Sequence, residues 1–219
     1  MKKCEFSEKL FESLLNREIL NKLFKNHCTP ELYSPSQTDE SKKGYDAHFK
    51  GVSKRCFAIQ YKLSSQYERK NKKAKIKKND FKIQIYKSKT NGYNQHNQLV
   101  KQNRSKKIIA FYCAPKFTTL KELQKYAKDE KLTSNCIWSI PKDSLPKWDK
   151  ESHMILHRKN FTQMRSMNHY LVETIDFDAF FGLGNNRSDI LLEPLEAETL
   201  KKIIYDEIDI SEDLYFIIY

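Results

Sequence analysis

Carboxylate, amide and lysine side chains recur at three places in the first third of the sequence. Asp46 lies in a short segment that alternates between apolar and polar residues. Gln60 and Lys62 stand two residues apart in the next such segment, so a strand would place both on one face. Glu8 and Glu12 are four residues apart and would share one face of a helix. Carboxylates that hold Mg²⁺ beside a lysine can hydrolyse phosphodiester bonds, which is the chemistry this set predicts.

Each residue type has a distinct role in that chemistry. Asp46 and Glu12 are the preferred ligands for Mg²⁺ or Mn²⁺, and Gln60 could complete the site with a neutral amide oxygen. Lys62 could stabilise charge on the phosphate or orient the attacking water. Glu8 is a further ligand candidate, or only a partner of the helix dipole. Two acids of the following polar stretch are lower-ranking substitutes, namely Asp39 and Glu40.

Hydrophobic periodicity predicts the elements that must position these residues. Ser7 is a suitable N-cap for a helix over 7–25, and alternation predicts strands over 45–49 and 55–63 that form a hairpin. The polar stretch 30–43 is expected to be a loop or an irregular edge strand. Further elements are expected as strands over 81–86, 108–114, 134–140 and 153–157 and as helices over 95–103, from Thr119 and over 195–208.

This order of elements favours one α/β or α+β domain with a mixed sheet. The run 108–114 is apolar on both faces, so it is expected inside the sheet with helices on each side. No internal repeat or linker divides the chain.

The motifs resemble those of the PD-(D/E)XK nuclease superfamily, in the branch with glutamine in the third motif, such as Mrr-type restriction nucleases and related prokaryotic defence effectors. Phe11-Glu12, Gly44-Tyr45-Asp46 and Gln60-Tyr61-Lys62 carry the resemblance over residues 7–115. It implies a restriction-endonuclease-like core, a mixed central sheet flanked by helices, over residues 1–130. Residues 131–219 would then form a C-terminal extension packed on the same domain. It also implies a Mg²⁺-dependent nuclease that acts in anti-phage or restriction defence, either as a homodimer or with a partner in a defence complex.

The charge distribution favours a polyanionic partner. The net charge is +12, and a basic stretch between residues 69 and 78 is expected to track a nucleic-acid backbone, with DNA favoured over RNA. The expected contacts are Arg69, Lys70, Lys72, Lys73, Lys75, Lys77, Lys78 and, near the predicted second helix, His96. A solvated loop that only keeps the protein soluble is the simpler interpretation of that stretch.

Cysteine usage and hydropathy point to a cytoplasmic protein. The five cysteines are widely spaced without a CxxC pair, which is typical of free thiols in a reducing compartment. No apolar run is long enough for a membrane span, and charged residues interrupt the N-terminus, so a signal peptide is not expected.

Three other interpretations compete with a nuclease. A D…QxK pattern arises easily in a lysine-rich chain, so the protein could be a non-catalytic nucleic-acid-binding subunit of a defence complex. A toxin or inhibitor that binds an acidic protein would also suit the charge. His153 and His157 have a spacing that zinc ligands can have, although a strand with polar histidines explains them better.

Overall fold

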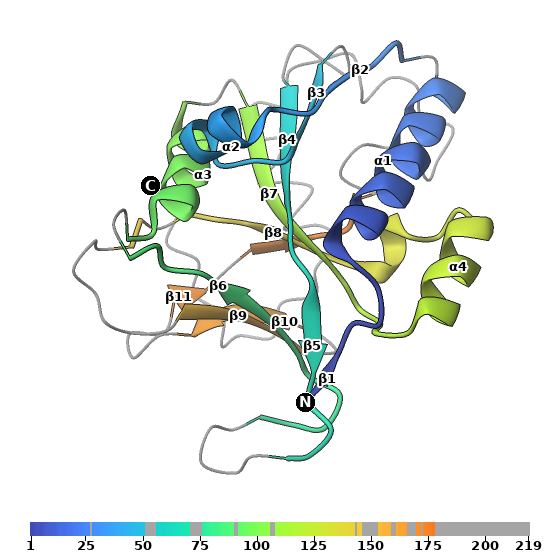
Figure 1. Ribbon diagram of the computed structural model, residues 1–219, viewed down its shortest axis with the longest axis vertical. Coiled ribbons are helices and arrows are strands. Elements are labelled where there is room, and N and C mark those ends of the chain that lie inside the picture. Colours follow the sequence, from blue (N-terminus) through green and yellow to red (C-terminus); the bar gives the residue numbers. More distant parts are fainter. Residues whose placement is uncertain are drawn as a thin grey trace, which may run out of the picture.

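Over the residues that it describes, the computed structural model combines helices with two six-stranded sheets (Figure 1). The described residues are 1–26, 28–50, 56–70, 76–89, 92–105, 108–142, 144–145, 153–158, 161–165, 170–171 and 173–177. The helices are α1 (Glu8–Lys25), α2 (Gln37–Lys43), α3 (Asn94–Arg104), α4 (Leu120–Lys128) and the short 3₁₀ helix η1 (Thr133–Asn135). The strands are β1 (Lys2–Lys3), β2 (Glu31–Tyr33), β3 (Ala47–Lys50), β4 (Cys56–Tyr61), β5 (Ser64–Gln66), β6 (Phe81–Ile85), β7 (Ile108–Pro115), β8 (Cys136–Ile140), β9 (His153–Arg158), β10 (Phe161–Arg165), β11 (Tyr170–Leu171) and β12 (Glu173–Ile175).

The first sheet is mixed and has the order β12-β8-β7-β4-β3-β2. Strands β4 and β7 pair in parallel, with Gln60 opposite Tyr112, and every other pair in this sheet is antiparallel. A parallel pair needs a crossover, and α3 lies in the segment that provides it. The predicted mixed sheet is therefore confirmed.

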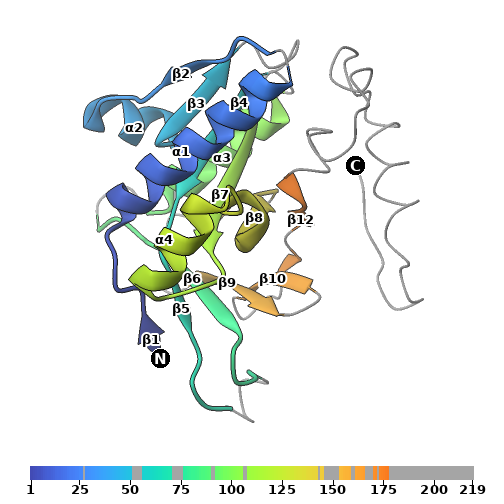
Figure 2. The ribbon, with the colours of Figure 1, turned by 90° about the vertical axis from the view of Figure 1, so that its right-hand side faces the viewer.

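Helices cover both faces of this sheet at β4 and β7 (Figure 1). Figure 2 shows α1 lying across β3 and β4 with α4 beside it. On that face Phe11 and Leu15 of α1 pack with Ile59 and Tyr61 of β4. On the other face Leu99 of α3 packs against small and aromatic residues, namely Ala58, Ala110 and Tyr112. The central strands are apolar on both faces because each face has its own core.

A second, antiparallel sheet has the order β1-β5-β6-β9-β10-β11. Only Lys62 and Leu63 separate β4 of the first sheet from β5 of the second. The chain thus runs directly from one sheet into the other, and the lysine of the third motif lies at the junction.

Most of the predicted elements are confirmed, and the structure adds α2, η1 and the short strands β1, β5, β10, β11 and β12. The helix over 7–25 begins where expected, since the Ser7 side chain accepts a hydrogen bond from the N–H of Leu10 at 3.2 Å. Thr119 and Glu122 form the predicted capping box. The stretch 30–43 contains the edge strand β2, but its second half is the helix α2 rather than a loop. The expected helix over 195–208 lies outside the described residues.

The residues after 130 are shared between the two sheets. Strands β8 and β12 extend the first sheet, whereas β9 to β11 belong to the second. Among the described residues, no helix is long and apolar enough to cross a membrane.

Glu18 joins α1 to the loop before β8, and its loss is expected to destabilise the fold. Its side chain is 3% exposed and accepts hydrogen bonds from the N–H groups of Leu132 and Thr133 at 2.8 and 3.0 Å and from the Thr133 hydroxyl at 2.9 Å. Glu18→Ala would leave these donors unsatisfied, so we expect a loss of about 3 kcal/mol in the free energy of unfolding, measured with urea. Glu130→Ala, which breaks an exposed ion pair with Lys25, should cost less than about 1 kcal/mol. Equal losses in the two variants would contradict this role for Glu18.

Candidate functional site

Asp46 and Gln60 meet where β3 begins and β4 ends. The Gln60 Nε2 donates to Asp46 Oδ2 at 2.6 Å, and the backbone N–H of Tyr61 donates to the same oxygen at 2.7 Å. The backbone N–H of Asp46 in turn donates to the Ile59 carbonyl at 2.9 Å, so antiparallel pairing of the two strands fixes the contact. Two of the sequence-predicted residues are thus in direct contact, and one carboxylate oxygen of Asp46 receives both hydrogen bonds.

Lys62 lies beside this pair and beside the first turn of α1. Its charge acts on the Asp46 and Glu8 carboxylates, and the N–H of Leu63 hydrogen-bonds to Glu8. The Lys62 backbone N–H donates to the Cys113 carbonyl of β7 at 2.9 Å, which continues the parallel pairing by one residue. Burial raises the pKa of Glu8, and Lys62 partly opposes that rise. The positive charge of Lys62 therefore acts on both carboxylates.

Glu40 and Gln95 complete the cluster from two helices. The Gln95 Nε2 donates to Gln60 Oε1 at 2.6 Å and to Glu40 Oε1 at 3.2 Å. Helix α2 can approach α3 this closely because it ends at Gly44, whose φ is +84°. A Cβ at Gly44 would lie 2.7 Å from the carbonyl oxygen of Gln95, so only glycine fits there. Glu40 was a lower-ranking candidate in the sequence, and Gln95 was not identified as a site residue.

Asp46 is held in an environment that opposes its ionisation. Burial is the main cause that raises the pKa of Asp46 to about 8, and the hydrogen-bonded Glu40 carboxyl raises it as well. Lys62 and the N–H of Tyr61 counteract that rise. A carboxyl with such a raised pKa is typical of a functional site, because stability alone would favour a neutral side chain there.

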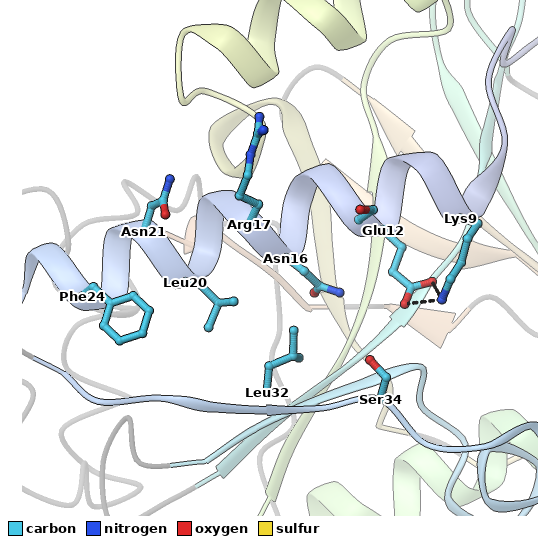
Figure 3. A pocket seen from close by; sticks show the side chains of 10 residues that line it. Lys9, Glu12, Asn16, Arg17, Leu20, Asn21, Phe24, Leu32 and Ser34 are labelled. Carbon is cyan, nitrogen blue, oxygen red and sulfur yellow. Dashed lines mark hydrogen bonds and ion pairs between the residues drawn. The ribbon is translucent and has the colours of Figure 1, made fainter.

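Glu12 lines a groove between α1 and the chain around β2, and its charge also raises the pKa of Glu8. Its side chain is 10% exposed and pairs with Lys9, whose Nζ lies 3.0 Å from Oε1 (Figure 3). Glu8, one turn earlier, is the α1 acid that interacts with Lys62. The Lys62 charge thus acts on Glu8, while Glu12, the acid preferred for its depth in the helix, acts on Glu8 from one turn further along.

The donors at the site suit a hard cation only in part. In the part of the chain that the structure describes, no group of three or more His, Cys, Asp or Glu side chains is arranged to hold a metal ion. Asp46, Glu40 and the Gln60 amide nevertheless offer oxygen donors within one hydrogen-bonded network. Mg²⁺ commonly binds through one or two carboxylates and keeps several waters, so this set is chemically suitable.

The basic residues expected to contact nucleic acid fall into two groups. Arg69, Lys70, Lys77 and Lys78 are exposed between β5 and β6, while Lys72, Lys73 and Lys75 lie outside the described residues. Asp80 anchors the end of this segment, because it pairs with Arg158 at 3.1 Å and accepts from the N–H of Lys77 at 2.8 Å.

The histidines are less accessible than the sequence suggests. His96 is 2% exposed, stacks on Tyr112 and lies 3.1 Å from its hydroxyl, so it offers no surface to a nucleic acid. His153 is 1% exposed on β9, where Gln84 of β6 donates to its carbonyl at 2.8 Å. Burial lowers the pKa of His157, on the same strand, to about 4. The buried position of His153 and the half-buried position of His157 are consistent with a structural role.

Gln95 escaped sequence-based identification because its contacts are non-local. It lies 35 residues from Gln60 and 55 from Glu40 along the chain. The one feature of the sequence that could have pointed to Gln95 is its position in the first turn of the predicted helix that comes after the QxK strand. No protein-family model, curated protein or solved structure matches this chain significantly, so the site rests on its own geometry.

Proposed function

We propose that this chain is a metal-dependent nuclease that hydrolyses phosphodiester bonds, with DNA favoured over RNA. The observation that supports this most is the meeting of Asp46, Gln60 and Lys62 at neighbouring strand ends, beside Glu8 and Glu40. A buried carboxyl that is hydrogen-bonded to an amide and acted on by a lysine charge is costly to assemble and contributes little to packing.

The arrangement of elements supports a restriction-endonuclease-like core. A helix (α1), an antiparallel hairpin (β3 and β4), a second helix (α3) and an apolar strand parallel to β4 (β7) follow one another along the chain. The D and QxK motifs lie on the two strands of that hairpin. Resemblance to prokaryotic defence nucleases extends the proposal to anti-phage or restriction defence in the cytoplasm, as a homodimer or with a partner.

In the proposed hydrolysis each residue has its own role. Asp46 would hold Mg²⁺ or Mn²⁺, with Gln60 and Glu40 as further oxygen donors. These residues would thereby supply the site with Lewis-acid chemistry, which polarises a phosphoryl group and makes a bound water more acidic. Lys62 places a positive charge where negative charge develops on the phosphate. Glu8 orients Lys62, and Gln95 holds the Gln60 amide in place.

One observation favours a second candidate, a non-catalytic nucleic-acid-binding subunit of a defence complex. The Gln60 amide presents its NH₂ group to Asp46, and its oxygen accepts from Gln95. Both polar atoms of the Gln60 amide therefore already have hydrogen-bond partners. To bind a metal beside Asp46, the amide would have to rotate so that its oxygen replaces its NH₂ group there.

A metal titration distinguishes the two candidates. For a nuclease, saturating Mn²⁺ should raise the melting temperature of the wild-type chain by about 5 °C, because a ligand that binds only the native state stabilises it. Asp46→Ala should abolish that shift, whereas Glu31→Ala, an exposed carboxylate of β2, should keep it. Salt-sensitive DNA binding without a saturable metal shift would favour the non-catalytic subunit. A wild-type chain that cuts neither DNA nor RNA with Mg²⁺ or Mn²⁺, with its partners supplied, would contradict the nuclease proposal.

A further inference from the structure

A groove of about 430 Å³ runs between α1 and the chain around β2 (Figure 3). Its wall on α1 includes Glu12, Asn16, Leu20 and Phe24, and Leu32 lies on the opposite side. This volume lies in the lower half of the range of about 300–1,000 Å³ that is usual for small-molecule sites. It can hold one small aromatic ligand with its polar groups, but not a double helix.

The groove has an apolar end and a polar end. Leu20, Phe24 and Leu32 form the apolar end, and the Phe24 side chain is exceptionally open to solvent for a phenylalanine, with 56% exposed. Asn16 lies toward the polar end, is 7% exposed, and is fixed because its Oδ1 accepts a hydrogen bond from the Tyr61 hydroxyl. An exposed ring at one end and a fixed amide at the other suit a ligand that is flat, apolar on its faces and polar at its edges.

Charge narrows the class of ligand. The chain carries a net charge of +12, and Lys9 and Arg17 border the groove. The Lys9 side chain is 80% exposed, so its ammonium can reach an anion while it stays close to Glu12. A base joined to a phosphate combines the flat apolar faces, the hydrogen-bonding edge and the negative charge that this lining would bind.

The groove is connected to the candidate site by α1 and β4. Glu12 lines the groove, and Glu8, one turn earlier, faces Lys62. Tyr61 holds Asn16 through its hydroxyl and Asp46 through its backbone N–H. A single strand of nucleic acid with one phosphate at Lys62 could therefore continue along α1, so that the next nucleotide enters the groove.

We infer that this groove binds one unstacked nucleotide of a single-stranded segment that adjoins the scissile phosphate, with its base on Phe24. The inference rests on the proposed nuclease function and gives it a substrate class, single-stranded or frayed nucleic acid. Bases in an intact duplex are stacked and paired, so they cannot enter the groove without being extruded.

Binding to three matched probes tests the inference without any need for cleavage. The probes are a short oligothymidylate, the same strand with abasic sites at its centre, and a duplex of the same length, measured in EDTA by fluorescence anisotropy. The first two carry the same phosphates, so their counterion release is equal and their difference reports the bases. Phe24→Ala should weaken binding of the oligothymidylate about tenfold and leave the abasic strand and the duplex unchanged.

Two further variants serve as controls. Phe24→Trp should bind the oligothymidylate at least as tightly as the wild type, because the larger ring also stacks on a base. Leu10→Ala removes a side chain of α1 that is 41% exposed and outside the groove, so it should change none of the affinities. The inference is overturned if Phe24→Ala binds the oligothymidylate like the wild type, loses affinity equally for all probes, or if the wild type binds none of them.

The same experiment separates this inference from the nuclease proposal. A chain that shows the Phe24-dependent preference but never cuts nucleic acid would keep the groove as a nucleotide site and remove the nuclease. A chain that cuts DNA while Phe24→Ala binds like the wild type would do the opposite.

Discussion

Plasmid cleavage in Mg²⁺ or Mn²⁺ is expected to fall by at least about 100-fold when Lys62 is replaced by alanine. The Lys62 charge acts on the Asp46 and Glu8 carboxylates, so a phosphate bound at this site would come under the same positive charge. Its backbone N–H bonds to the Cys113 carbonyl, and alanine keeps that bond. The substitution should therefore remove chemistry while the strand stays in place, and conversion of supercoiled to nicked or linear plasmid measures the loss.

The matched control is Lys50→Ala, which removes an exposed lysine of β3 outside the cluster. It lowers the net charge by the same amount, so it corrects for weaker attraction to DNA, and its cleavage should stay within about threefold of wild type. Asp46→Ala should be as inactive as Lys62→Ala. Cleavage that survives both substitutions would move the chemistry to other residues or to a contaminant.

Asp46→Asn is expected to stabilise the folded chain at neutral pH. The folded pKa of Asp46, about 8, lies above the ordinary value for an unfolded chain, about 3.9. The stability that the protonated group contributes is therefore fully present below about pH 4 and is lost as the pH rises through about 8. Asparagine resembles the protonated acid: its oxygen can accept from Gln60 and Tyr61, and its NH₂ group can donate to Glu40. At about pH 7.5 the variant should gain on the order of 3 kcal/mol.

Urea unfolding at about pH 5 and about pH 8 measures this effect. The advantage of Asp46→Asn over wild type should grow between the two pH values, while activity is lost. Asp129→Asn, at an exposed acid after α4, should differ from wild type by less than about 0.5 kcal/mol at both. An advantage that does not change with pH would show that Asp46 is not held in a desolvated site.

The sequence predicted those parts of the fold that local patterns determine. Residues 7–25 carry apolar side chains at helical spacing behind an N-cap serine, and Thr119 begins a capping box, so neighbours within a few residues define both helices. The unbroken apolar run 108–114 indicated a strand covered on both faces. Strand alternation placed Gln60 on one face of its strand and Ile59 and Tyr61 on the other, the face that packs in the α1 core.

Contacts between distant segments lay beyond local patterns. Helix α2 has almost no apolar residues, so periodicity could not reveal it, and it depends on a serine N-cap and on Gly44. The link from Gln95 to Gln60 and Glu40 joins three elements whose pairing no single window contains. Depth in the helix favoured Glu12, whereas the Lys62 charge acts on Glu8, in the first turn of α1.

The junction between the two sheets has a consequence for the entropy of the proposed catalysis. Lys62 is held on one side by its own bond to the Cys113 carbonyl and on the other by Ser64, whose hydroxyl donates to the Pro115 carbonyl at 2.5 Å. Both anchors belong to β7, so the backbone at Lys62 is immobilised when the sheet forms. Only the side-chain torsions remain to be ordered when a substrate arrives. Folding thus bears the backbone part of the entropic cost of placing this cation, and only the side-chain part is left to substrate binding.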